Sequence, residues 1–250
     1  MKSRLDVLLV ERGLVSTRER AKALILAGKV MVNGQKVDKA GAPVPPDATV
    51  DLLEQLPYVS RGGLKMEQAL REFAINPTGW VCIDIGTSTG GFTDCLLQHG
   101  AARVHCVDVG ATQIDWKLKT DPRVVLHEHS NARLIEPTKI AESARLLVCD
   151  VSFISVTLML DRFPALLTAD GEMVILVKPQ FEVGRADVGK GGIVREESLH
   201  QAACDKVESA LRALRYETRI LPSPILGGKG NREFLLHAKP SNRPSNNVSN

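Results

Sequence analysis

The sequence predicts an α/β protein: a parallel, Rossmann-like sheet wrapped by helices from about residue 61, preceded by a small α+β domain. Strand-like apolar runs alternate with helical patterns over most of the chain, as is typical of a parallel sheet. The first forty residues differ, with two short helical patterns and a hairpin signal. The 250 residues, 44% of them apolar, suffice for one full-sized domain and one small one.

The small domain is predicted over residues 1–54. Ser3 is expected to cap a first helix, which Gly13 ends. Ser16-Thr-Arg-Glu19 has the spacing of a capping box and opens a second helix. Asn33-Gly34 lies between two short apolar runs and predicts a tight β-hairpin.

This domain is basic. Up to residue 40 it has nine Lys and Arg against four Asp and Glu, an excess larger than the +3 of the whole chain. A basic helix face can bind phosphates, although the same charges could merely solvate a helical hairpin. The candidate RNA-binding residues are Arg4, Arg18, Arg20, Lys22, Lys29 and Lys36.

The order of these elements adds information that charge does not. Arg4-Leu-Asp-Val-Leu-Leu-Val10, Ser16-Thr-Arg-Glu-Arg-Ala-Lys-Ala-Leu-Ile25 and Gly28-Lys-Val-Met-Val-Asn-Gly34 together resemble the S4-like RNA-binding module. The resemblance covers roughly residues 3–52. It implies a docking surface for structured RNA along the second helix and the hairpin, where shape and backbone are recognised.

Residues 55–60 are predicted to be a linker, 61–239 the larger domain, and 240–250 a disordered tail too polar to bury. The apolar runs and helical periodicity give the elements of the larger domain. Strands are expected at 81–85, 104–108, 123–127, 146–149, 173–178, 217–221 and 233–238, and helices near 63–73, 91–99, 155–167 and 197–214.

The most informative stretch is Cys82-Ile-Asp-Ile-Gly-Thr-Ser-Thr-Gly-Gly-Phe92, a buried strand that turns sharply into a helix. Asp108 ends the next strand, where a carboxylate can bind both ribose hydroxyls of a nucleoside cofactor. The glycine spacing departs from G-x-G-x-x-G, which favours S-adenosylmethionine over a dinucleotide. An ordinary tight turn is the alternative. Candidate cofactor residues are Gly86, Gly90, Gly91, Phe92, Asp108, Asn131 and Asp150, although Asn131 could equally be a simple loop residue.

Four charged residues are candidates for catalysis. Asp150 and Lys178 follow apolar strands, at the sheet edge where ligands of parallel sheets bind. Lys65 lies on the entering helix and Glu233 at the last strand. Separately each could be structural, but a lysine that ends an apolar strand needs a partner, and Asp150 is the natural one.

The motifs around these residues carry a second resemblance. Ser60-Arg-Gly-Gly-Leu-Lys65, Asp150-Val-Ser-Phe-Ile-Ser155, Val177-Lys-Pro-Gln-Phe-Glu182 and Gly230-Asn-Arg-Glu-Phe-Leu-Leu-His237 resemble the K-D-K-E tetrad regions of FtsJ-like RNA 2′-O-methyltransferases. With the first domain, residues 3–238 are similar to the TlyA, or haemolysin A, family. The resemblance implies methylation of cytidine ribose in ribosomal RNA by S-adenosylmethionine, with ribosomal RNA or ribosomal subunits as partner. Thr87 stands where an alanine is usual, and its hydroxyl is expected to bond the backbone of the turn.

The resemblance makes Lys178 the residue that accepts or orients the proton of the ribose hydroxyl. A free lysine has a pKa of about 10.4, so a general base needs a strongly lowered value. Burial and the ammonium of Lys65 lower the pKa, whereas Asp150 raises it. If Asp150 dominates, Lys178 stays charged and stabilises the developing oxyanion. Glu233 then positions Lys65 or the ribose.

The composition limits the alternatives. Single cysteines, without a signal peptide or a membrane-spanning run, favour a reducing cytoplasm and argue against a membrane-lytic toxin. No metal is expected, because His127, Glu128 and His129 have no further ligands nearby. A non-catalytic ribosome-assembly factor is the main alternative. The glycine-rich loop 183–195 could order over RNA or be a plain connection, and the oligomeric state stays open.

Overall fold

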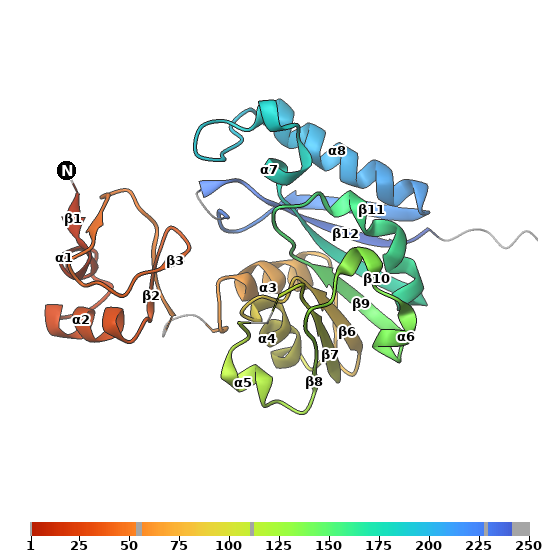
Figure 1. The fold of residues 1–250 in the computed structure, drawn as a ribbon, viewed down its shortest axis with the longest axis horizontal. Coiled ribbons are helices and arrows are strands. Elements are labelled where there is room, and N and C mark those ends of the chain that lie inside the picture. The colour runs from red at the N-terminus through yellow and green to blue at the C-terminus, as the bar shows by residue number, and fades with distance from the viewer. Residues whose placement is uncertain (1, 54–56, 111–112, 228–229, 242–250) are drawn as a thin grey trace, which may run out of the picture.

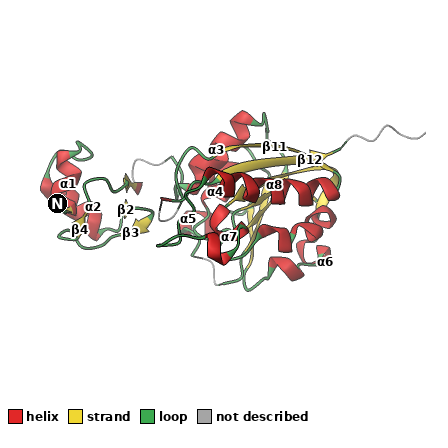
Figure 2. Cartoon of the chain, turned by 90° about the horizontal axis from the view of Figure 1, so that it is seen from above, coloured by secondary structure: helices red, strands yellow, loops and turns green. Residues whose placement is uncertain are grey.

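The computed structural model describes residues 2–53, 57–110, 113–227 and 230–241, which form two domains lying side by side (Figure 1). The turned view in Figure 2 shows the same separation. Most of the expected tail, residues 242–250, and linker residues 55 and 56 lie outside the described residues. Pro240 belongs to the last strand and Ser241 donates its amide hydrogen to the carbonyl of Arg215, so the expected tail begins too early.

The N-terminal domain has the predicted helices and hairpin around a small core that includes Leu5, Leu9 and Ile25. Asn33 and Gly34 have φ values of 49° and 78°, as a tight hairpin turn with two left-handed residues requires. Its elements are β1 (Ser3–Arg4), α1 (Leu5–Glu11), α2 (Arg18–Leu26), β2 (Val30–Val32), β3 (Gln35–Lys36), β4 (Pro43–Val44) and β5 (Val50–Leu52).

Both predicted helix caps in this domain are wrong. Ser3 pairs with Val44 in the β1–β4 ladder, so α1 starts after Arg4 and has no side-chain cap. Thr17, one residue after Ser16, caps α2, and its hydroxyl accepts a hydrogen bond from the amide of Arg20 at 3.2 Å. The cap moved because Thr17 is the residue with extended backbone.

The larger domain is a seven-stranded sheet in the order β11-β12-β10-β9-β6-β7-β8. Its strands are β6 (Val81–Ile85), β7 (Arg103–Val107), β8 (Val124–His127), β9 (Ala144–Cys149), β10 (Leu167–Val177), β11 (Tyr216–Pro222) and β12 (Phe234–Pro240). The sequence predicted a parallel sheet, but β12 pairs antiparallel with both of its neighbours, β10 and β11. The chain passes from β11 to β12 in the residues between Pro222 and Phe234, and β12 returns between β11 and β10.

Helices cover both faces of this sheet, as continuous apolar strands predict. On one face α3 and α4 pack on Cys82 and Val104, and on the other α8 packs with Ile83 and Ile85, because successive strand residues point to opposite sides. The α-helices are α3 (Gly62–Glu72), α4 (Gly91–Gln98), α5 (Trp116–Lys119), α6 (Pro137–Ile140), α7 (Pro179–Glu182) and α8 (Glu197–Ala213).

Three segments differ from the prediction. The helix expected at 155–167 consists of two 3₁₀ segments, η3 (Val156–Leu158) and η4 (Leu160–Leu166), since Pro164 removes a backbone donor. Strand β10 begins at Leu167, before the expected 173, with an irregular register up to Glu172. Glu233 precedes β12 rather than starting it.

Candidate active site

Three cavities meet at the carboxyl end of the central strands. The first, of about 310 Å³, lies between the glycine turn after β6 and the side chains of Lys65, Asp150 and Lys178. The second, of about 360 Å³, is lined by Asp108 and Asn131. The third, of about 460 Å³, extends from Lys178 past α7 to the β2–β3 turn. Ser152 lines all three, so the cavities converge beside the strand ends.

The four charged residues expected from the sequence lie together here as two buried ion pairs. The Nζ atom of Lys178 lies 2.5 Å from Oδ1 of Asp150, and Nζ of Lys65 donates to Oε2 of Glu233 at 2.5 Å. Lys65 and Glu233 are 168 residues apart in the chain. The Lys178 ammonium also donates to the hydroxyl of Ser152 at 2.8 Å, a contact that the sequence did not predict.

The electrostatics of the first pair favour a charged lysine. Burial lowers the pKa of Lys178, but the carboxylates of Asp150 and Glu233 outweigh burial, and the pKa is raised. Burial likewise raises the pKa of Asp150, but Lys178 and Lys65 reverse this, and the pKa is lowered. Both partners are therefore ionised near neutral pH.

The turn after β6 brings backbone close to the first two cavities. Gly86 has φ of 84°, and a Cβ atom there would lie 2.6 Å from the carbonyl oxygen of Asp150, so only glycine fits. Gly90 has φ of 91° but lines neither of these two cavities, and a Cβ atom there would lie 2.3 Å from the Leu118 side chain. The hydroxyl of Thr87 donates to the carbonyl of Asp84 at 2.9 Å, which confirms the expected bond to the turn.

The remaining cofactor candidates are spread over these two cavities. Asp108 accepts hydrogen bonds from the amides of Ser88 at 3.0 Å and Gly110 at 3.1 Å, which fix its carboxylate at the second cavity. Asn131 lines the same cavity, and its side-chain oxygen accepts from the amide of Arg133. Gly91 and Phe92 border the first cavity, although the Phe92 ring is mostly buried in the core.

Sequence reasoning missed Asp84, which lies inside β6 and borders the first cavity. Its Oδ2 accepts the hydroxyl of Thr93 at 2.6 Å, whereas its buried Oδ1 has no hydrogen-bond partner. Burial raises the pKa of Asp84 to about 7, and Asp150 adds to the effect. An acid within an apolar strand just before the glycines was the signal for it.

Two further acids position the site. Glu182 of α7 accepts the Val156 amide at 2.7 Å and the Ser155 hydroxyl at 2.5 Å, and it pairs with Lys206 of α8 at 3.1 Å. It therefore fixes the segment after Asp150. The sequence showed this acid only as the end of a motif, without its partners.

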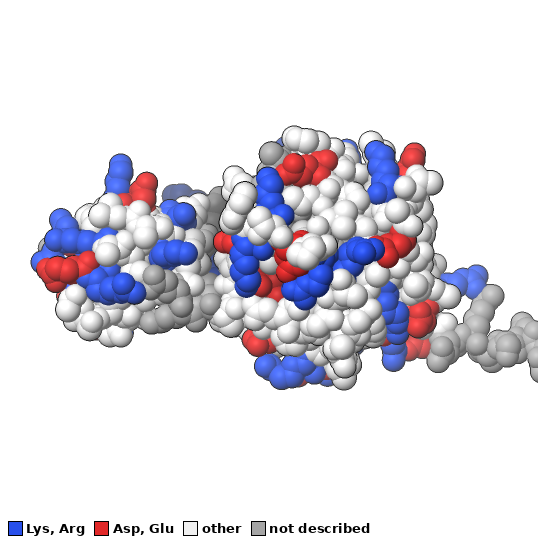
Figure 3. All heavy atoms as spheres, turned by 90° about the horizontal axis from the view of Figure 1, so that it is seen from below, with Lys and Arg blue, Asp and Glu red and all other residues white. Residues whose placement is uncertain are grey.

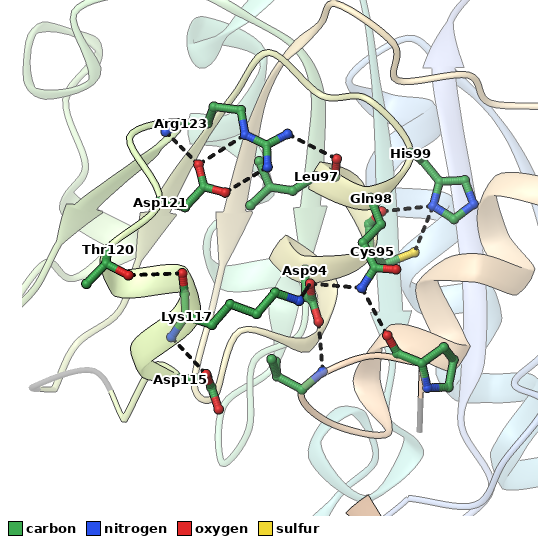
Figure 4. A network of polar contacts seen from close by, with 12 residues as sticks. Asp94, Cys95, Leu97, Gln98, His99, Asp115, Lys117, Thr120, Asp121 and Arg123 are labelled. Atoms are coloured by element: carbon green, nitrogen blue, oxygen red, sulfur yellow. Dashed lines mark hydrogen bonds and ion pairs between the residues drawn. The ribbon is translucent and has the colours of Figure 1, made fainter. Parts of the chain in front are cut away.

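The second is Asp94, in the first turn of the helix after the glycine turn (Figure 4). Its carboxylate accepts the Val59 amide at 2.8 Å, the Gln98 side chain at 3.0 Å and the Lys117 ammonium at 3.0 Å. The end of the linker, α4 and α5 are thereby joined beside the glycine turn.

The candidate RNA-binding residues are all exposed on the N-terminal domain, and Figure 3 shows basic side chains, with acidic ones among them, on the face of this domain that it draws. Arg4 and Arg18 each lie 3.0 Å from the buried carboxylate of Asp6. Their hydrogen bonds, above all that from Arg4, lower the pKa of Asp6 to about 2 despite its burial. About half of each arginine side chain stays exposed, so its guanidinium can also face a phosphate.

Two of the expected absences can be examined over the described part of the chain. Within the described ranges, no group of three or more His, Cys, Asp or Glu residues could hold a metal ion. His127 instead lies 2.9 Å from the ring of His105. No helix of the described residues is long and apolar enough to cross a membrane. The five cysteines are buried and unpaired with one another.

Comparisons with known proteins agree with both domains. The family model of FtsJ-like methyltransferases matches residues 58–240, and that of the S4 domain matches residues 3–50. The candidate rRNA methyltransferase YqxC of Bacillus subtilis is 48% identical over 94% of this chain and 85% of its own length. The 16S/23S rRNA (cytidine-2′-O)-methyltransferase TlyA of Mycobacterium tuberculosis is 40% identical over 94% and 89%. A solved structure of a candidate hemolysin from Streptococcus thermophilus superposes with a TM-score of 0.76, at 44% identity, over 99% of this chain and 91% of that one.

Proposed function

We propose that this chain, which belongs to the FtsJ-like methyltransferase family and carries an S4 domain, methylates the ribose 2′-hydroxyl of cytidine in ribosomal RNA, with S-adenosylmethionine as the methyl donor. The observation that carries the proposal is the meeting of two buried Lys–carboxylate pairs where three cavities join. The names of the relatives support the substrate class.

The residues around the first two cavities fit this cofactor. Asp108 would bind the ribose hydroxyls and Asn131 the adenine, while the unpaired oxygen of Asp84 would accept a hydrogen bond from the amino group of the methionine part. Gly86 borders both cavities, and because it has no Cβ atom the turn can lie against the Asp150 carbonyl beside them. When bound, the cofactor would supply a methyl group bonded to a positively charged sulfonium sulfur, and after transfer of that methyl group the rest of the cofactor is a neutral thioether.

The ammonium of Lys178 orients the acceptor. It donates a hydrogen bond to the ribose oxygen, which aims a lone pair of that oxygen away from the ammonium, and it stabilises negative charge that develops as the hydroxyl proton is lost to solvent. Asp150 keeps Lys178 protonated and in place. The Lys65–Glu233 pair, which borders the third cavity through Glu233, holds the ribose from the other side.

The N-terminal domain supplies affinity for RNA in this proposal. Its basic face contacts phosphates and makes binding salt-dependent, whereas the larger domain provides the chemistry. In this proposal the first domain comprises residues 1–54 and the larger one residues 61–240, because Pro240 belongs to the last strand. A ribosomal RNA partner also places the reaction in the cytoplasm.

Mapping of ribose methylation tests the proposal. Ribosomal RNA is compared from cells with the gene, without it, and with the gene carrying Lys178→Ala. We expect 2′-O-methylcytidine at one or more positions only with the unchanged gene. Identical methylation maps in all strains would leave the non-catalytic assembly factor as the better account.

A further inference from the structure

The third cavity has features that the cofactor does not use. None of the residues of the glycine turn, and neither Asp108 nor Asn131, line it. Lys178 and Glu233 form its inner end, and its volume of about 460 Å³ is within the range of about 300–1,000 Å³ that is typical of small-molecule sites. It therefore lies on the acceptor side of Lys178.

One polar group in this cavity lacks a partner. Gln180, in α7 and two residues after Lys178, lines the cavity, and its Oε1 atom is buried without a hydrogen-bond partner. A buried amide oxygen without a hydrogen-bond partner destabilises the fold, so the presence of a glutamine at this position needs an explanation, such as a ligand that donates to the oxygen. Nearby amides are already used: Asn231 accepts from the Val194 amide and donates to the Gly192 carbonyl, and Asn33 accepts from the Thr49 amide.

The walls of the cavity suit a flat ring. Phe153 and Phe181 both line it, with their ring centroids 5.3 Å apart. Phe153 is 92% exposed, so its ring is open to a ligand. Bases in single-stranded RNA are commonly bound by such aromatic faces, with hydrogen bonds to their polar edges.

We propose that Gln180 is the specificity-determining residue for the acceptor base, its Oε1 atom accepting a hydrogen bond from the exocyclic amino group of cytosine. This inference rests on the proposed function. The amino group of cytosine is a donor, whereas uracil has a carbonyl oxygen at the same position, so the unpaired acceptor selects cytidine. With the ribose hydroxyl at Lys178, the base extends along α7 towards Gln180.

The test uses the full-length protein and ribosomal RNA or subunits with cytidine or uridine at the mapped position. Gln180→Met keeps the length of the side chain but removes the acceptor, and Gln180→Glu keeps an accepting oxygen. Gln201→Met is the matched control, at an exposed position of α8 that lines none of the three cavities. Initial rates at saturating cofactor give kcat/KM for each RNA.

We expect the wild-type protein to prefer cytidine by about tenfold or more. Gln180→Met should lose about tenfold in kcat/KM for cytidine and bring the preference close to one, with unchanged cofactor affinity, whereas Gln180→Glu and Gln201→Met keep the preference. A merely structural Gln180 would lower both rates equally, and an unchanged preference in Gln180→Met overturns the assignment. No methylation by the wild-type protein would overturn the proposed function as well, so the two failures are distinguishable.

Discussion

Replacement of Lys178 by methionine tests the core of the proposed chemistry. The change keeps most of the side-chain volume but removes the ammonium that lies 2.5 Å from Asp150 and 2.8 Å from the Ser152 hydroxyl. Loss of one charge-stabilising donor typically lowers kcat by about 10²–10³. Cofactor affinity should stay within about twofold, because in our assignment Asp84 and Asp108 hold the cofactor.

The same change should destabilise the fold. It leaves the Asp150 carboxylate without its cation, and breaking a buried pair costs about 3–5 kcal/mol. The Asp150 side chain is 23% exposed, which favours the lower end, about 3 kcal/mol. In a chain of this length this corresponds to a fall in Tm of about 6–12 °C. Adding Asp150→Asn removes the unpaired charge, so the double variant should regain Tm but not activity.

The assay combines kcat from methyl transfer to ribosomal RNA, calorimetric titration with the cofactor, and thermal unfolding. Lys139→Met, at an exposed position of α6, is the control. A kcat within tenfold of wild type, or a loss of cofactor binding in step with activity, would refute the role of Lys178. An inflection of kcat near neutral pH that disappears in Lys178→Met would instead show that Lys178 acts as a neutral base.

Three further perturbations follow from the structure. Because the pKa of Asp84 is raised to about 7, its proton stabilises the fold at low pH, and stability falls as the pH rises through 7; Asp84→Asn should remove this slope, worth up to about 4 kcal/mol, and raise Tm at pH 8 while weakening cofactor binding. Wild-type cofactor affinity should fall as the pH drops below 7, and a pH-independent affinity would contradict the placement of Asp84 in the site. Gly86→Ala should lower the free energy of unfolding by about 1–3 kcal/mol and weaken cofactor binding, because the added Cβ atom meets the Asp150 carbonyl. Unchanged thermal unfolding would show that the turn adapts. The third change neutralises three exposed lysines of the N-terminal domain, Lys22, Lys29 and Lys36. The slope of log K for RNA binding against log salt concentration should become shallower by about 2–3, without a change in cofactor titrations. An unchanged slope would exclude these lysines as the RNA contact.

Local pattern determined much of the fold. The apolar runs predicted the strand ends to within two residues, except for the start of β10 at Leu167, because burial on both faces requires continuous apolar sequence. The Asn33-Gly34 turn was predictable for a different reason, because few residue types readily adopt the positive φ values that both of its positions require. The antiparallel β12 and the 3₁₀ segments near Pro164 were not, because they depend on which strands a loop can join and on packing across the sheet.

The sequence by itself determined the strands and the long helices, the glycine turn and the four charged residues that motif resemblance singled out. The sequence also named Asp150 as the partner of Lys178, whereas only the tertiary structure decided that Glu233 pairs with Lys65 and that Lys178 stays charged. The Lys178–Asp150 contact keeps the lysine charged, a balance of burial against neighbouring charge that no local pattern contains. The roles assigned to Asp84, Glu182 and Gln180 likewise depend on partners, or on the lack of one, far away in the chain. Sheet register and loop paths bring such groups together, so their chemistry becomes readable only when the distances are known.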